Sequence, residues 1–296
     1  MIDRACISLS DRCNLKCRYC HFQEKQSGSS VFACEEVERV IKNIHAYCSK
    51  SGLRTFKLGI VGSGEPLLEK DILYNMLDFI QKKRFSEFQL YTITNGTLLD
   101  EETIRSLLEY RSMLKICISL DGYEEIHNYG RSKFTRVMEA VTLYKALFQS
   151  SPAINATVNL QSYLNKEKVI SFFLDNELTE VTFSRIFGCH QKDLAVTREQ
   201  FVEFLAYARS SGIISRQFSN MLSYDCAMYG KLCGVGRTNI FITPEGIYPC
   251  GRFYRLEKYK LGNCTDSLFF IEEKCNELDP VENGLCFYEA RVEEKK

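Results

Sequence analysis

The sequence predicts an α/β fold: an open, partial (β/α)6 barrel followed by a small cysteine-rich module built from a β-hairpin and a helix. Three observations support this prediction. Short apolar stretches alternate with helical ones up to about Ser210, the alternation then stops, and cysteines gather towards the two ends of the chain. Alternating strands and helices favour a parallel sheet with helices outside it. We therefore expect two domains, residues 1–210 and residues 211–296.

Six strand–helix units make up the predicted barrel. Apolar runs predict strands at residues 5–9, 56–61, 89–94, 114–120, 154–160 and 180–186. Apolar residues at helical spacing predict helices at residues 35–48, 72–83, 133–148, 166–176 and 198–209, with a further helix after Asp100. Asp100 is a good N-cap, and Thr197 forms a capping box with Gln200.

Sites in folds of this kind lie at the carboxyl ends of the strands. The sequence places polar or glycine-containing segments at four of these ends: a cysteine loop after the first strand, residues 62–65 after the second, Asn95-Gly96 after the third and Asp121 after the fourth. We therefore expect these segments to meet in space.

The module after Ser210 is predicted from a change of pattern. Two short apolar runs at residues 239–243 and 247–249 flank a Pro244-Glu245-Gly246 turn, which is typical of a β-hairpin, and a helix is expected at residues 267–278. This part of the chain contains six cysteines: Cys226, Cys233, Cys250, Cys264, Cys275 and Cys286. In a cytosolic chain of this size, such cysteines indicate metal binding or catalysis rather than disulfides.

Composition excludes several function classes. Lys plus Arg and Asp plus Glu both number 38, and no long run of one sign occurs, so nothing indicates nucleic-acid or membrane binding. No apolar stretch reaches 18 residues, which excludes a membrane-spanning helix, and residues 1–4 leave no room for a signal peptide. We expect a cytoplasmic protein.

The cysteine loop carries the clearest chemical signal. Cys13, Cys17 and Cys20 have the spacing C-x3-C-x2-C. Three thiolates on one loop can hold three corners of a [4Fe-4S] cluster and leave the fourth iron open to a ligand. The alternative is a structural zinc site with His21 as the fourth ligand.

This spacing, followed by Gly62-Ser63-Gly64-Glu65 after the second strand, resembles the radical S-adenosylmethionine superfamily. The resemblance implies a TIM-like partial barrel in which the open iron binds S-adenosylmethionine. The cluster then donates one electron, which splits the sulfonium to give a 5'-deoxyadenosyl radical, and this radical abstracts a hydrogen atom from the substrate.

The resemblance also implies the residues that bind the cofactor. Gly62, Ser63, Gly64 and Glu65 match the segment that binds the methionine ammonium, with Ser63 standing where glycine is usual. Tyr19 matches the aromatic residue that lies against the adenine. Ser119 and Arg131 match positions that contact the ribose or the methionine carboxylate.

The C-terminal module resembles the SPASM/Twitch subfamily, on Cys233-Gly234-Val235-Gly236-Arg237, the hairpin with Cys250, and Leu261-Gly262-Asn263. The resemblance implies one auxiliary [4Fe-4S] cluster, and so two clusters in all. Its expected ligands are Cys226, Cys233, Cys250 and Cys286, with Cys264 or Cys275 as alternatives.

Cys189, just after the sixth strand, stands where a thiol could donate a hydrogen atom to a substrate radical. An inert, buried thiol is the alternative at this position.

Most SPASM/Twitch relatives modify peptides, so the resemblance implies a ribosomally synthesised precursor peptide as substrate, changed by crosslinking, epimerisation or oxidation. A flavodoxin- or ferredoxin-type reductant is the implied electron source. Because only residues 1–4 precede the first strand, leader recognition would need another surface or a separate leader-peptide-binding protein.

Three other functions remain open. Sulfatase-type maturases carry an acidic residue after the hairpin cysteine, where this chain has Gly251. A Twitch-type dehydrogenase of a small molecule such as an aminoglycoside is the second, and a two-cluster electron carrier without its own chemistry is the third.

Overall fold

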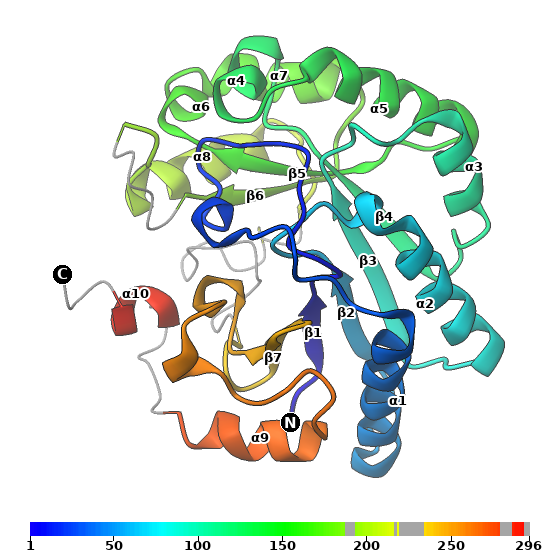
Figure 1. Ribbon diagram of the computed structural model, residues 1–296. Coiled ribbons are helices and arrows are strands. Elements are labelled where there is room, and N and C mark those ends of the chain that lie inside the picture. The colour runs from blue at the N-terminus through cyan, green and yellow to red at the C-terminus, as the bar shows by residue number, and fades with distance from the viewer. Residues whose placement is uncertain (187–192, 216–217, 219–233, 279–285, 293–296) are drawn as a thin grey trace.

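The structure is a computed structural model that describes residues 1–186, 193–215, 218, 234–278 and 286–292. Within these residues, eight strands form one sheet in the order β6-β5-β4-β3-β2-β1-β7-β8 (Figure 1). The strands are β1 (Arg4–Ile7), β2 (Phe56–Ile60), β3 (Phe88–Thr94), β4 (Leu114–Ser119), β5 (Ala153–Val158), β6 (Val181–Arg185), β7 (Asn239–Thr243) and β8 (Gly246–Tyr248). All neighbours are parallel except β7 and β8. The predicted α/β partial barrel is confirmed.

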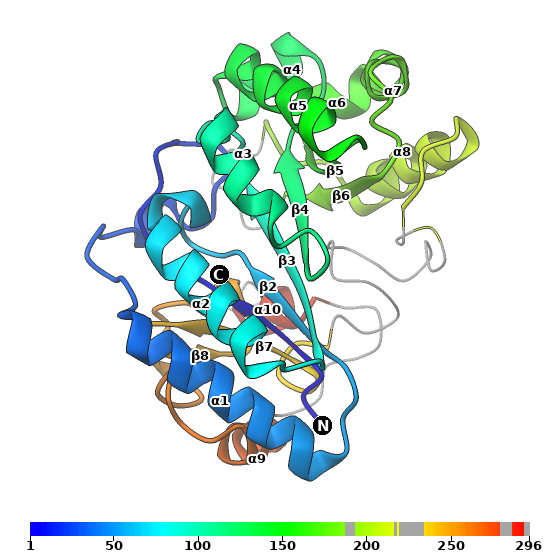
Figure 2. The same cartoon turned by 90° about the vertical axis from the view of Figure 1, so that its right-hand side faces the viewer.

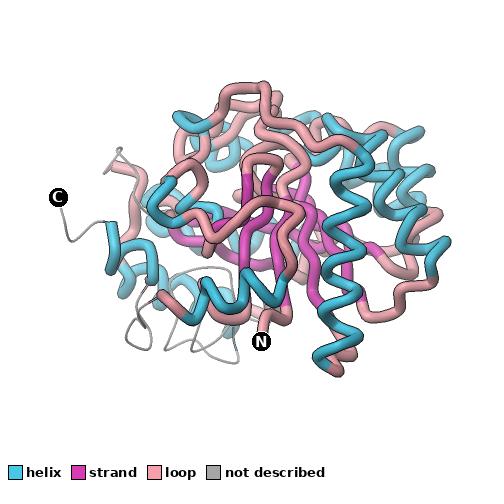
Figure 3. Tube along the Cα trace, turned by 60° about the horizontal axis from the view of Figure 1, so that its bottom comes forward, coloured by secondary structure: helices cyan, strands magenta, loops and turns pink. Residues whose placement is uncertain are grey.

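Most helices lie around the outside of the strands (Figures 1 and 3), whereas Phe287 of the last helix packs with Phe241 on the interior face. The helices are α1 (Cys34–Ser51), α2 (Lys70–Lys83), α3 (Glu101–Leu108), α4 (Glu124–Gly130), α5 (Phe134–Phe148), α6 (Leu160–Leu164), α7 (Lys166–Asp175), α8 (Arg198–Ser210), α9 (Leu268–Asn276) and α10 (Phe287–Val292). Neighbouring helices pack in pairs along one side of the sheet, α1 against α2 and α3 against α5 (Figure 2).

The two faces of the sheet differ because alternate residues of a strand point to opposite sides. Apart from the half-buried Arg185 at the end of β6, one face is buried beneath the helices, where Phe183 contacts the rings of Phe173 of α7 and Phe204 of α8. The other face lines the barrel interior, where Cys6, Tyr91 and Asn155 are only half-buried.

Local capping signals are confirmed. The Asp100 side chain accepts a hydrogen bond from the backbone N–H of Thr103 at 2.8 Å and caps α3. Thr197 and Gln200 form the expected capping box at α8.

Two strands end two residues earlier than their apolar patterns predict, β1 at Ile7 and β5 at Val158. β5 stops at Val158 because the Asn159 side chain accepts a hydrogen bond from Ser162 N at 2.9 Å and starts α6. The short α4 was also not predicted, since its seven residues show no extended apolar repeat.

The predicted hairpin forms, but it joins the barrel sheet. β7 pairs in parallel with β1, with Arg4 opposite Asn239 and Ile7 opposite Ile242. α9, beyond the hairpin, packs against α1. The division into domains at residue 210 stays a prediction. No helix in the described ranges is long and apolar enough to cross a membrane.

Candidate active site

The cysteine loop lies between β1 and α1, at the carboxyl end of β1. Cys17 is buried, Cys20 is half-buried and Cys13 is exposed. Burial raises the pKa of the Cys17 thiol to about 11, against the opposing charge of Arg131. Burial likewise raises the pKa of Cys20. Iron binding removes these thiol protons, so metal binding and thiolate formation are coupled at this loop.

The three thiols of the loop lie within electrostatic reach of one another. Besides burial, the Cys13 and Cys20 thiolates both raise the pKa of Cys17, and the Cys20 thiolate raises the pKa of Cys13. In a [4Fe-4S] cluster each thiolate binds a different iron, and in a zinc site with His21 all ligands would surround one ion. Three thiols gathered on one loop are the donor set that such a cluster needs.

The segment after β2 packs directly on the start of the cysteine loop. A Cβ on Gly64 would lie 2.4 Å from the Arg12 carbonyl oxygen, so only glycine allows this approach. The backbone N–H of Glu65 donates to the same Arg12 oxygen at 2.8 Å. Ser63 is accommodated because its N–H donates to Ser8 Oγ at 2.9 Å and the two hydroxyls lie 3.0 Å apart.

Glu65 ties this segment to the end of β3. Its side chain is 3% exposed. Oε1 accepts hydrogen bonds from Thr94 Oγ1 at 2.6 Å and Leu67 N at 3.1 Å, and Oε2 accepts from Asn95 N at 2.7 Å. Burial raises the pKa of this carboxyl despite these bonds. A carboxylate has about four acceptor positions, so one position remains after these three bonds.

Asp121 is the centre of a buried network at the end of β4. Its Oδ1 accepts from Thr157 N at 2.8 Å, both oxygens accept from Arg131 Nε at 3.2 Å, and Oδ2 accepts from the Tyr19 hydroxyl. Asp121 was predicted to lie at a strand end, but no role was predicted for it. Its position at the carboxyl end of a barrel strand was the signal that could have marked it as a site residue.

Arg131 is held by Asp121 at the cysteine loop. Its guanidinium lies 5.3 Å from the centre of the Tyr19 ring, one terminal nitrogen is 3.9 Å from Cys17 Sγ, and the other donates to Thr157 Oγ1 at 3.4 Å. Burial alone would lower its pKa, but the Asp121 charge raises the pKa further above its usual range. Arg131 is thus a fixed, permanent cation beside Tyr19 and Cys17.

Uncharged polar residues line the barrel interior next to this network. Ser119 of β4 stands opposite Asn155 of β5, which stands opposite Thr182 of β6, and Ser184 lies one row further along β6. Ser119 is 4% exposed and the others are half-buried. Asparagine and hydroxyl side chains both donate and accept hydrogen bonds, so this face can bind uncharged amide groups.

Cys250 lies on the same aromatic cluster as the cysteine loop. Cys20 and Cys250 both pack against a buried group of aromatic rings: Phe22, Phe241, Tyr248, Phe253, Tyr254 and Phe287. Cys286 directly precedes Phe287, whereas Cys264 and Cys275 are buried in the main hydrophobic core. Cys286 is therefore next to the aromatic cluster that Cys250 contacts, whereas Cys264 and Cys275 belong to the main core. Cys189, Cys226 and Cys233 lie outside the described residues.

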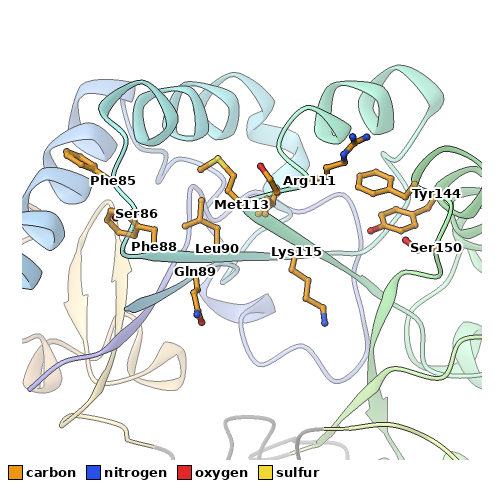
Figure 4. A pocket seen from close by; sticks show the side chains of 13 residues that line it. Phe85, Ser86, Phe88, Gln89, Leu90, Arg111, Met113, Lys115, Tyr144 and Ser150 are labelled. Atoms are coloured by element: carbon orange, nitrogen blue, oxygen red, sulfur yellow. The ribbon is translucent and has the colours of Figure 1, made fainter. Parts of the chain in front are cut away.

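A groove of about 660 Å³ lies at the opposite end of the strands (Figure 4). It is formed at the amino ends of β3 and β4, where Leu90 and Met113 line it and Gln89 and Lys115 point to the other side of the strands. The groove is therefore separate from the site at the carboxyl ends.

Comparison with known proteins finds similarity in sequence and in fold. A cysteine-type anaerobic sulfatase-maturating enzyme of Clostridium perfringens is 24% identical over 296 residues, covering 87% of this chain and 76% of that protein. The structure of native anSMEcpe with bound AdoMet is similar at a TM-score of 0.76 and 21% identity, over 93% of this chain and 82% of that one. The structure of Streptococcus suis SuiB bound to precursor peptide SuiA is similar at a TM-score of 0.71 and 16% identity. This similarity covers 92% of this chain and 64% of that one.

The two structural similarities concern the fold. The family itself is identified by the sequence: the pattern of the Radical SAM superfamily matches residues 7–169, more than half of the chain and the part that contains the cysteine loop, Glu65, Asp121 and Arg131. This chain belongs to the radical SAM superfamily and is a radical SAM enzyme.

Proposed function

We propose that this enzyme modifies a peptide, a ribosomally synthesised precursor, by abstracting a hydrogen atom from it. Cys13, Cys17 and Cys20 would hold the family's [4Fe-4S] cluster. When bound, this cluster supplies an open iron and one electron, with which S-adenosylmethionine is split to the 5'-deoxyadenosyl radical that takes the hydrogen atom.

One observation carries the assignment of the cofactor residues. Arg131, fixed by Asp121, is close to both the Tyr19 ring and Cys17 Sγ, so a cation for the methionine carboxylate stands beside the metal-binding loop. The remaining acceptor position of Glu65 and the backbone of Gly62, Ser63 and Gly64 would bind the ammonium. Ser119, Arg131 and Tyr19 would orient the ribose, carboxylate and adenine.

A peptide substrate is supported by the barrel interior. The row of Ser119, Asn155 and Thr182 offers donors and acceptors without charge, which suits the amide groups of a peptide backbone. Similarity of fold to a protein solved with a precursor peptide agrees with this proposal. The proposal includes an auxiliary [4Fe-4S] cluster on Cys226, Cys233, Cys250 and Cys286. It also includes a flavodoxin- or ferredoxin-type protein as the electron donor.

Sulfatase-type maturation is the second candidate, because the sulfatase-maturating enzyme of Clostridium perfringens is similar over 87% of this chain. The residue after the hairpin cysteine weighs against it. A Cβ on Gly251 would lie 2.7 Å from Phe22 Cζ, so no acidic side chain can stand there without moving Phe22.

The test begins with anaerobic purification, measurement of iron and sulfide, and incubation with reductant and S-adenosylmethionine. About eight irons for each chain, as expected for two four-iron clusters, together with 5'-deoxyadenosine would support the radical enzyme. Iron without 5'-deoxyadenosine would favour the electron carrier. Co-expression with a small peptide encoded beside the enzyme then tests the substrate, and an unchanged peptide mass under active conditions argues against it.

A further inference from the structure

Arg255 joins the C-terminal hairpin to the loop that carries Cys13, Cys17 and Cys20. Its Nε donates to both carboxylate oxygens of Glu245, in the turn between β7 and β8, at 3.1 and 3.0 Å. A terminal nitrogen donates to Asp11 Oδ2 at 3.2 Å and Ser27 Oγ at 2.9 Å. The other terminal nitrogen donates to the Lys25 carbonyl oxygen. One guanidinium therefore contacts the chain before Cys13 and after Cys20.

Asp11 connects the two ends of the metal-binding loop through hydrogen bonds. It is 1% exposed and stands two residues before Cys13. Its Oδ2 accepts from the N–H and the hydroxyl of Ser27, both at 2.8 Å, and its Oδ1 accepts from Ser30 N at 3.2 Å. One buried carboxylate thus connects the segment before Cys13 to the segment after Cys20. Arg255 contacts this carboxylate.

The Arg255 guanidinium is shared by two carboxylates. It donates to Asp11 Oδ2 and to both oxygens of Glu245. The hydrogen bond from Arg255 lowers the pKa of Glu245. Without Arg255, these two carboxylates would face each other across the junction with no cation between them.

The backbone of Arg255 shows how firmly the contact is held. Its φ angle is 61°, in the left-handed region that residues other than glycine seldom adopt. Such a conformation persists where surrounding contacts fix it. Here they are five hydrogen-bond acceptors and the Tyr254 ring, whose centre is 5.0 Å from the guanidinium.

We propose that Arg255 is a positioning residue for the metal-binding loop, so that the S-adenosylmethionine site is complete only when the C-terminal hairpin is docked on residues 11–27. The inference rests on the proposed function. Arg255 acts through Asp11 and the loop backbone and does not itself touch a reacting group. The C-terminal hairpin is then a structural part of the cofactor site.

The test uses the reconstituted holoenzyme with S-adenosylmethionine as the probe. In the reduced enzyme, the change in the EPR signal on adding S-adenosylmethionine reports the cluster on Cys13, Cys17 and Cys20, and its concentration dependence gives an apparent Kd. Arg255→Gln should raise this Kd at least about tenfold and alter the signal, while Arg255→Lys, which keeps the charge, should recover part of the loss.

Arg105→Gln is the matched control. Arg105 donates two hydrogen bonds to Glu101 on the exposed surface of α3, at 2.9 and 2.7 Å, so it forms the same kind of pair away from the loop. It should leave the Kd and the signal unchanged. An Arg255→Gln enzyme with the wild-type Kd and signal would overturn the proposal, as would an equal loss in Arg105→Gln.

Glu245→Gln keeps the inference testable if Arg255→Gln does not fold. This variant retains the contact between Asp11 and Arg255 and weakens only the hairpin side, so it should give a smaller rise in Kd, of at least about threefold. A wild-type Kd in a folded Glu245→Gln enzyme would contradict the proposal. A wild-type enzyme whose EPR signal does not respond to S-adenosylmethionine would instead refute the proposed function.

Discussion

The ring of Phe22, two residues after Cys20, fills the space beside the backbone of Gly251, one residue after Cys250. A Cβ on Gly251 would come within 2.7 Å of Phe22 Cζ and 3.3 Å of Phe22 Cε1. A side chain at position 251, next to the predicted cluster ligand Cys250, would therefore clash with the ring that follows the cysteine loop.

Gly251→Ala should destabilise the protein because it overpacks this contact, at a cost of about 1–3 kcal/mol. Urea unfolding of the iron-free chain measures the change. In a Phe22→Ala background the same substitution should cost clearly less, since the opposing ring is gone. An equal cost in both backgrounds would show that the contact with Phe22 is not the cause.

Asp121→Asn should be strongly destabilising, because it leaves the buried Arg131 cation without its counter-charge. Breaking a buried pair by removing one partner costs about 3–5 kcal/mol. The double variant Asp121→Asn with Arg131→Met should be more stable than the sum of the single changes predicts. Unfolding free energies of the four proteins give this coupling, and strict additivity would refute the pairing.

Iron content should identify the ligands. Cys17→Ala and Cys250→Ala should each reduce the iron from about eight to about four for each chain, since each removes one cluster. Cys264→Ala and Cys275→Ala are the controls and should keep the full content, because both thiols are buried in the main core. Loss of iron in either control variant would indicate that the substituted cysteine, and not Cys286, is the fourth ligand.

Acid should weaken the junction between the hairpin and the metal-binding loop. Asp11 and Glu245 have a pKa lowered by folding. A carboxyl of this kind stabilises the fold above its unfolded pKa, about 3.9–4.3, and this stability is lost as the pH falls through the folded pKa. The Tm of the iron-free chain should therefore change little from pH 7 to about 5 and fall below about pH 4. Asp11→Asn should show a smaller fall, and an identical acid profile would contradict this origin.

Cys189→Ala should separate radical formation from product formation. If the Cys189 thiol donates a hydrogen atom to a substrate radical, its S–H bond breaks, a C–H bond forms, and the remaining thiyl radical must be reduced by the external reductant. The variant should then form 5'-deoxyadenosine at the wild-type level without the finished product. Mass spectrometry of the peptide decides, and an unchanged product yield would eliminate the role.

Local signals in the sequence predicted the local parts of this structure. Asp100 and Thr197 start helices as expected, because an N-cap needs only the next turn of chain. The carboxyl ends of β2 and β4 meet the cysteine loop, as the parallel arrangement requires. Asn159 was overlooked as a cap since it follows an apolar run that reads as a longer strand.

The contacts that could not be predicted join distant parts of the chain. Arg255 and Asp11 are 244 residues apart, and β7 lies next to β1 although they stand at opposite ends of the sequence. No periodicity or capping pattern encodes such a pair. Asp121 could be placed at a strand end, but its three partners come from a loop, a helix end and another strand.

The pairing of β7 with β1 also determines when the sheet can be finished during synthesis. β1 is made first, but one of its edges has no partner until residues 239–243 leave the ribosome. An unpaired edge exposes a row of N–H and C=O groups that can pair with another chain, and contacts so distant in sequence form slowly. During synthesis, β1 therefore has an unpaired edge, prone to aggregation, until β7 has been made. A product that ends before residue 239 lacks β7, so this edge of β1 stays unpaired.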